Sequence, residues 1–226
     1  MVGRVLSQRH RTARLAWVRA RHRWRVHTWQ HILFSDKFRY SFPFDDGRYR
    51  VYRRRGERFT EQGVYESVRF GGGRVIFWAG ICHEVRTQLK IVQGTLNAIS
   101  YHYRNDIPDP IVLPFLQQRN FDHFFTHDNA RCHLARVCPD FLNQNHIRIL
   151  PWPPLPSDLS PIEHLWNELG RRVCHRKHLT ETLQGLCDSL VHEWENIPQA
   201  FIQRLIGSMH RRCEALIAAR DGHARY

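Results

Sequence analysis

The pattern of apolar and polar positions changes along the chain from strand periods to helix periods. Short apolar or alternating runs predict strands at 32–34, 40–42, 48–52, 75–79, 89–92, 121–127 and 147–150. Apolar residues three and four apart predict helices over about 98–119, 130–144, 160–173, 179–194 and 201–216. Strands first, then strands mixed with helices, then helices only, indicate an α/β fold with a mixed sheet covered by helices.

Composition says more about the binding partners of this chain than about its fold. The 226 residues suit one domain, or a domain with an appendage, and an apolar share of 42% can build a real core. A net charge of +13 and a sequence pI near 10.2 favour a polyphosphate partner such as nucleic acid. A basic protein of membrane surfaces is the rival, but no apolar run approaches the roughly 20 residues of a spanning helix. There is also no apolar signal-peptide block, so we expect no membrane association.

The first 30 residues form a basic segment, with eight Arg and no Asp, Glu or Lys. Six residues can share one helical face, which predicts a basic amphipathic helix: Leu6, Ala13, Ala16, Trp17, Ala20 and Trp24. Two interpretations stay open. The helix packs on the domain through its Trp residues, or its arginines contact DNA, with Arg19, Arg21 and Arg23 as the candidates.

Cysteine and histidine are frequent, but their spacing favours neither disulfides nor zinc. The six Cys lack framework spacing and indicate reduced thiols of an intracellular protein. His127, Cys132 and His133 are close in sequence, and Cys82-His83 and Cys174-His175 are adjacent pairs. None of these groups has the two-residue gaps of a structural zinc site. A serine nucleophile elbow and a Walker loop are absent too.

Three acidic residues stand where a site would form. Asp36 follows the apolar run at 32–34, Asp128 follows the run at 121–127, and Glu163 opens the helix that starts at Ser160-Pro161. Sites of mixed sheets form at the carboxyl ends of strands, so two strand-end carboxylates and one helical carboxylate could hold a pair of hard cations. Such a pair cleaves phosphodiesters without a covalent protein intermediate.

Each acid also has a purely structural interpretation. Asp36 could be a turn residue, and Asp128 could cap the following helix. Glu163 lies three residues after Ser160, which is the spacing of a capping box. The hypothesis of a site therefore rests on the three together.

The residues of several motifs resemble those in the catalytic domain of Tc/mariner-superfamily transposases, with the Tc-type branch most similar. The matching stretches cover nearly the whole chain: residues 26–36, 46–58, 77–80, 113–118, 127–133 and 157–172. The last two, His-Asp-Asn-Ala-Arg-Cys-His and Ser-Asp-Leu-Ser-Pro-Ile-Glu-His-Leu-Trp-Asn-Glu-Leu-Gly-Arg-Arg, are very specific. The 34 residues between Asp128 and Glu163 also fit that family.

The resemblance implies a ribonuclease-H-like mixed sheet flanked by helices, with a β-rich arm insertion and C-terminal helices. It implies a metal site of Asp36, Asp128 and Glu163 that holds two Mg²⁺ or Mn²⁺ ions, with Asp36 bridging them and Asn129 assisting. The expected reaction is DNA transposition on transposon ends and target DNA, in the nucleus and with a homodimer as an option. Arg53, Arg54, Arg55 and the N-terminal arginines would neutralise phosphates.

This resemblance, together with the pattern, divides the chain into a basic helix or linker (1–30), a catalytic core (31–174) and a helical extension (175–226). Three departures from the family pattern matter. Lys37 replaces an acidic residue after Asp36, and Pro156-Ser157-Asp158 changes the turn before the Glu163 helix. Third, the helix-turn-helix modules that precede this domain in full-length relatives are missing, which predicts a fragment, a decayed copy or a domesticated one.

Two rival functions remain open at this stage. A DNA-binding protein that kept the fold and lost the reaction would explain Lys37 and the missing modules. A ribonuclease H proper would cut RNA–DNA hybrids but not DNA.

Overall fold

The computed structural model describes residues 6–41, 74–92, 108–119, 122–127, 137–176 and 182–219. Within these ranges one mixed sheet contains β1 (Ile32–Ser41), β2 (Arg74–Ile81), β3 (Lys90–Val92) and β4 (Phe124–Thr126). The strand order is β3-β2-β1-β4. The β1–β2 and β2–β3 pairs are antiparallel, and β4 is parallel to β1. The predicted mixed sheet is therefore confirmed.

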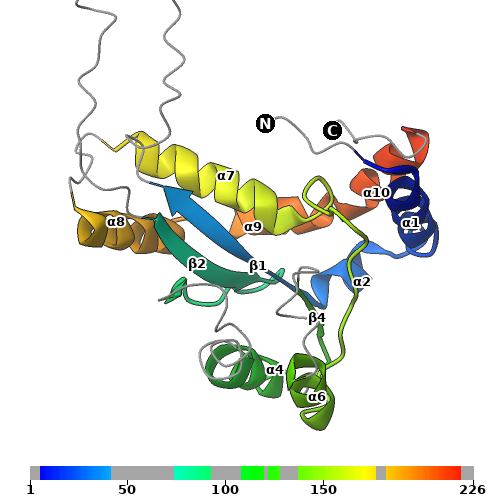
Figure 1. Ribbon diagram of the computed structural model, residues 1–226, viewed down its shortest axis with the longest axis horizontal. Helices are drawn as coiled ribbons and strands as arrows, with labels where there is room; N and C mark the ends of the chain where they lie inside the picture. The colour runs from blue at the N-terminus through cyan, green and yellow to red at the C-terminus, as the bar shows by residue number, and fades with distance from the viewer. Residues whose placement is uncertain are drawn as a thin grey trace, which may run out of the picture.

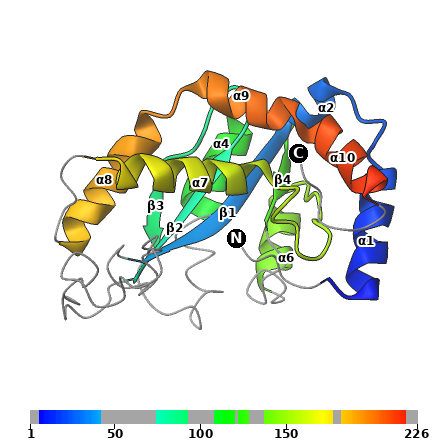
Figure 2. The same ribbon diagram turned by 90° about the horizontal axis from the view of Figure 1, so that it is seen from above.

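Helices cover both faces of this sheet (Figures 1 and 2). One face carries α7 (Pro161–Cys174), α8 (Leu183–Glu195) and α9 (Gln199–Gly207). The other carries α4 (Leu113–Gln117), which follows a π-helical turn at Pro108–Val112, and α6 (Val137–Gln144). Beyond the end of the sheet, α1 (Gln8–Arg19) packs beside α10 (Met209–Ala218), and α2 (Val26–Gln30) leads into β1.

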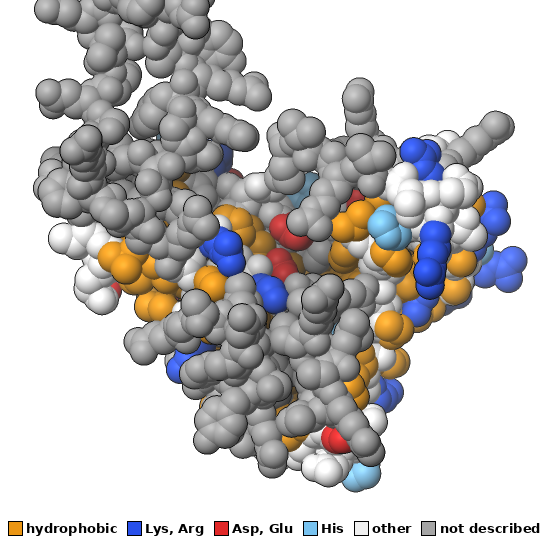
Figure 3. Space-filling view, in the orientation of Figure 1, with side chains coloured by type: hydrophobic (Ala, Val, Ile, Leu, Met, Phe, Trp, Pro, Cys, Tyr) orange, Lys and Arg blue, Asp and Glu red, His pale blue; other side chains and the backbone are white. Residues whose placement is uncertain are grey.

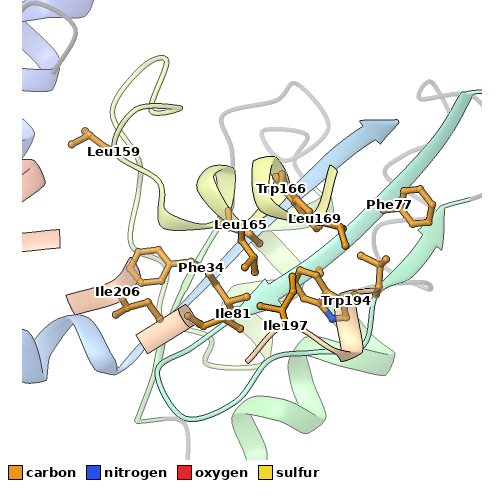
Figure 4. Close-up of a cluster of buried hydrophobic side chains, with 14 of the residues drawn as sticks. Phe34, Phe77, Ile81, Leu159, Leu165, Trp166, Leu169, Trp194, Ile197 and Ile206 are labelled. Carbon is orange, nitrogen blue, oxygen red and sulfur yellow. The ribbon is translucent and has the colours of Figure 1, made fainter. Parts of the chain in front are cut away.

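Strand alternation produces a separate core on each face of the sheet. Phe34, Phe77 and Ile81 are buried on the α7 face, where Figure 4 shows them with Leu165, Trp166 and Leu169 of α7 and Trp194 of α8. The opposite core joins strand residues to α4 and α6 through Leu33, Trp78, Phe125, Phe115, Leu116 and Leu142. Full burial of such side chains contributes about 1.5–3 kcal/mol each, so these two cores fix the sheet between its helices.

Strand β1 is longer than its apolar run predicts, and this corrects the place of Asp36. Asp36 lies in the middle of β1, paired with Ala79 of β2, and is neither a strand end nor a turn residue. The predicted strands at 32–34 and 40–42 are one strand up to Ser41. The physical reason is the antiparallel partner, which satisfies the backbone of the polar stretch while Phe38 and Tyr40 continue the apolar alternation.

Other elements agree with the pattern to differing degrees. Strands at 75–79 and 89–92 and the helix that begins at Pro161 are confirmed. The predicted strand at 147–150 is only one parallel bridge between Ile149 and Phe125. The N-terminal helix breaks after Arg19, and the last predicted helix divides at Ser208 into α9 and α10. Predictions for 42–73, 98–107 and 128–136, including the arm insertion, lie outside the described residues.

The three-part division of the chain stays a prediction. The core on the α7 face includes Trp17 from α1, Leu190 from α8 and Leu216 from α10, so residues of all three predicted parts share one buried cluster. Across the described ranges, no helix combines the length and the apolar character that a membrane span needs.

Candidate active site

Asp36 extends from β1 toward α7. Because it lies two residues from Phe34 and two from Phe38, it shares their face of the strand. Its side chain is half-buried, and its Oδ2 accepts a hydrogen bond of 3.1 Å from the indole Nε1 of Trp166. One carboxylate oxygen of Asp36 is thus tied to the helix that covers the sheet.

Glu163 lies in the first turn of that same helix. Pro161 takes the first helical position, where its missing N–H costs nothing. A capping box would need bonds from both Ser160 and Glu163. The Ser160 side chain makes no cap bond, and the Ser160 N–H donates to the Pro156 carbonyl at 2.9 Å. These contacts do not support the capping interpretation, and the positive end of the helix dipole favours the ionised form of Glu163.

Trp166 links Asp36 to the helix that carries Glu163. It follows Glu163 by three residues on α7, so both side chains lie on neighbouring positions of one helix face. Its indole donates to Asp36 on β1, 130 residues away in sequence. Figure 3 shows acidic side chains at the centre of the visible face, between apolar groups and Lys or Arg side chains. Strand β1 and helix α7 therefore place Asp36 and Glu163 in the same part of the molecule.

Strand β4 leads toward the third predicted acid. In the parallel β1–β4 pair, Phe34 is the partner of Thr126. Ser35 Oγ donates to the Thr126 carbonyl at 2.6 Å, and Thr126 Oγ1 donates to the Leu33 carbonyl at 3.2 Å. These side-chain bonds fix β1 against β4 immediately before Asp36.

Asp128 itself lies outside the described residues, as do Asn129, Cys132 and His133. Among the described residues, no group of three His, Cys, Asp or Glu side chains could hold a metal ion. The structure thus describes two of the three predicted ligands, on a strand and a helix joined by the Trp166–Asp36 bond, and the three-residue site stays a prediction.

The histidine beside Glu163 in the sequence has a lowered pKa. Burial first, and then the Arg212 guanidinium, lower the pKa of His164, although Asp158 opposes the shift. These surroundings favour the neutral form of the imidazole.

The candidate DNA-contacting arginines of the N-terminal segment differ in their surroundings. Arg19 and Arg23 are exposed. Arg21 is half-buried, lies 4.5 Å over the Trp17 ring and donates to the Trp17 carbonyl at 3.2 Å. Burial lowers the pKa of its guanidinium. Arg21 therefore has a packing role, and Arg53, Arg54 and Arg55 lie outside the described residues.

The loop before α7 is anchored by residues that the sequence pattern did not single out. Arg14 of α1 is fully buried, donates to Asp158 at 2.6 Å and also bonds the Leu155 carbonyl. From α10, Arg212 donates to the Asp158 carbonyl at 3.2 Å. From the sequence, Arg14 was only one of the arginines in the basic segment. The altered turn at 156–158 was the one signal that pointed to this loop.

Comparison with known proteins identifies the family. No protein-family model matches the chain. The chain is 31% identical to the Tc1 transposase of Caenorhabditis elegans over 220 residues, which is 97% of this chain and 78% of that protein. It belongs to the Tc-type transposases of the Tc/mariner superfamily. The Tcb2 transposase of Caenorhabditis briggsae is 29% identical over 98% of the chain, and the Tc3 transposase of C. elegans is 27% identical over 88%.

Solved structures confirm the ribonuclease-H-like fold of this transposase domain. The catalytic domain of Mos1 mariner transposase is similar with a TM-score of 0.71 at 16% identity, and the match covers all of both chains. In a Mos1 paired-end complex with the left transposon end, the TM-score is 0.77 at 18% identity, and the chain spans 66% of the Mos1 chain. The Tc-type relatives and this fold together make the chain a DNA transposase catalytic domain.

Proposed function

We propose that this transposase domain cleaves and joins DNA strands with divalent metal ions held by Asp36, Asp128 and Glu163. The observation that carries the proposal is the bond from Trp166 to Asp36, which ties β1 to the helix that opens with Glu163. Two structural alternatives are not supported, because Asp36 lies inside β1 and not in a turn, and the Ser160 side chain makes no cap bond.

The chemistry of the donor set suits hard cations. Carboxylate oxygens are the ligands that Mg²⁺ and Mn²⁺ prefer, and Mos1 catalytic-domain structures with Mg and with Mn support divalent metal use in this fold. Two ions would supply an activated water or 3′-hydroxyl and would stabilise the leaving oxygen of an in-line displacement. Asp36, Asp128 and Glu163 would hold these ions.

The protein's own contribution is to place these carboxylates and to bind DNA. Strands β1 and β4 are locked together by Ser35 and Thr126, so the chain leaves β4 toward Asp128 from a fixed point. Exposed arginines such as Arg19 and Arg23 would neutralise phosphates, together with Arg53 to Arg55. Mos1 complexes with transposon ends support DNA as the partner. We also propose that the protein forms a homodimer and acts in the nucleus.

The direction of the Lys37 side chain weakens the interpretation that this protein has lost its catalytic activity. Its cross-strand partner is Trp78, which belongs to the core on the α4 face, whereas Asp36 lies on the α7 face. The strand therefore directs Lys37 away from the face on which Asp36 meets Trp166.

The test is nicking of supercoiled plasmid in Mg²⁺ or Mn²⁺. Wild type should nick. The variants Asp36→Asn, Asp128→Ala and Glu163→Gln should each lose more activity than the roughly 100-fold that is typical when a residue hydrogen-bonded to a metal ligand is replaced. Asp122→Asn is the matched control, because its carboxyl is exposed and pairs with the partly exposed side chains of His31 and Arg148. Persistent nicking by Asp128→Ala would overturn the mechanism, and cleavage of RNA–DNA hybrid alone would indicate a ribonuclease H.

A further inference from the structure

We propose that Trp166 is a positioning residue for Asp36, a role that rests on the proposed metal site. Its indole N–H donates to Asp36 Oδ2 at 3.1 Å. Groups that hydrogen-bond a metal-ligating carboxylate fix its orientation, and their loss typically lowers metal affinity or activity 10- to 100-fold. The indole therefore sets the rotation of a carboxylate that would hold metal ions.

The surroundings of Trp166 hold the indole itself in place. The side chain is 1% exposed and contacts two other aromatic rings. Phe38 of β1 stacks on it at 5.5 Å between ring centroids, and Trp194 of α8 stacks on it at 5.4 Å. Trp194 is fixed in turn, because its Nε1 donates to the Thr87 carbonyl at 3.0 Å. A buried donor held by two stacked rings can hold its acceptor without losing further side-chain freedom.

The chemical type of the donor also fits this role. An indole N–H is neutral and only donates, so it orients a carboxylate without cancelling its negative charge. An Arg or Lys in the same place would compete electrostatically with a divalent cation. Because Trp166 lies on α7 three residues after Glu163, the same rigid helix sets the positions of both acids.

Trp166→Phe isolates the hydrogen bond, because phenylalanine keeps an aromatic ring against Phe38 and Trp194 but has no N–H. Trp17→Phe is the matched control. It removes a buried indole bond to the Pro151 carbonyl, outside the group of rings that contacts Trp166. Both variants should lose similar thermal stability, so a difference in metal binding between them reports on Asp36 alone.

The first readout is Mn²⁺ binding by isothermal titration calorimetry without DNA, and the second is the Mg²⁺ concentration for half-maximal nicking. Trp166→Phe should weaken Mn²⁺ binding about 10-fold and raise the Mg²⁺ requirement in proportion. Trp17→Phe should change both by less than about 2-fold. In an Asp36→Asn background, Trp166→Phe should have no further effect on Mn²⁺ binding.

Equal metal affinity of Trp166→Phe and Trp17→Phe would overturn the proposal while leaving the proposed function intact. Failure of the proposed function itself is distinguishable, because wild type and Asp36→Asn would then bind Mn²⁺ equally. If Trp166→Phe does not fold, the indole N–H resonances of the wild type decide the question. One of them should shift with added Mg²⁺ in wild type and stay unshifted in Asp36→Asn, and no shifting indole resonance in wild type would refute the role.

Discussion

At the scale of single residues, the direction of a side chain matters more than its place in the sequence. Asp36 and Lys37 are neighbours, yet β1 turns one toward α7 and the other toward the α4 face. The strand period could be predicted from sequence, and it already allowed Lys37 to face away. The bond from Trp166 to Asp36 could not, because no local pattern reveals a contact across 130 residues.

The first prediction concerns Lys37. Lys37→Glu should change the Mg²⁺ requirement for nicking by less than about 2-fold, far less than the roughly 10-fold expected for loss of an outer-shell hydrogen bond at Trp166. The reason is that its backbone position directs it to the face opposite Asp36. The measurement is a Mg²⁺ titration of plasmid nicking. A large gain in metal affinity would show that the lysine reaches the acids.

The second prediction concerns His123, a buried imidazole beside β4. Burial first, then His31 and Arg119, lower its pKa, while Asp122 and Glu84 oppose the shift. Because the unfolded chain takes up the proton more readily, His123 should cost stability as pH falls from the ordinary histidine pKa of about 6.5 to its lowered folded value. Above that window its contribution is constant.

His123→Leu should therefore reduce the loss of unfolding free energy between pH 7.5 and pH 5, measured by urea denaturation. His192→Gln, at an exposed position of α8, is the control and should follow wild type. An unchanged pH slope in His123→Leu would contradict the assignment.

At the scale of elements, partners across the sheet decide what the pattern leaves open. Charged residues interrupt the apolar run after Phe34, so sequence underestimates β1, and pairing with β2 supplies the missing information. The start of α7 was predictable, because Ser160-Pro161 is a strong local signal. The break between α9 and α10 was not, since the apolar spacing continues through Ser208.

The third prediction concerns the attachment of α1 to the loop before α7. Arg14→Ala should lower the free energy of unfolding by roughly 3–5 kcal/mol, because it leaves the Asp158 carboxylate without its buried partner. Arg19→Ala, on the exposed side of the same helix, should stay within about 0.5 kcal/mol of wild type. Urea denaturation measures both. Similar stabilities of the two variants would contradict an anchoring role.

At the scale of the whole molecule, the fold class and the family could be predicted because motifs typical of one family occur along nearly the whole chain. The three candidate acids could be named from the sequence, and their role as metal ligands stays a prediction, whereas the contacts around them could not be predicted. Arg14, Ser35, Thr126 and Trp166 act through contacts between distant segments, and such contacts leave no mark in periodicity or local spacing.

The fourth prediction concerns DNA affinity, which should be mainly electrostatic for a chain with a net charge of +13. The logarithm of affinity for duplex DNA should fall with the logarithm of salt by about 0.9 for each phosphate contacted. Arg19→Ala and Arg23→Ala together should weaken binding across all sequences and reduce that slope by about 2. Fluorescence anisotropy at several salt concentrations measures it, and a flat salt dependence would contradict phosphate binding.

The most direct test of the central claim is a crystal structure of the protein with Mn²⁺, in which anomalous scattering locates the ions. The account predicts two Mn²⁺ peaks about 3.5–4 Å apart. Oxygens of Asp36, Asp128 and Glu163 should coordinate them, and Trp166 should still donate to Asp36. Peaks elsewhere, or any one of the three carboxyl groups turned more than ~10 Å away from the ions, would contradict the proposed site, because ions that close together must share their ligands.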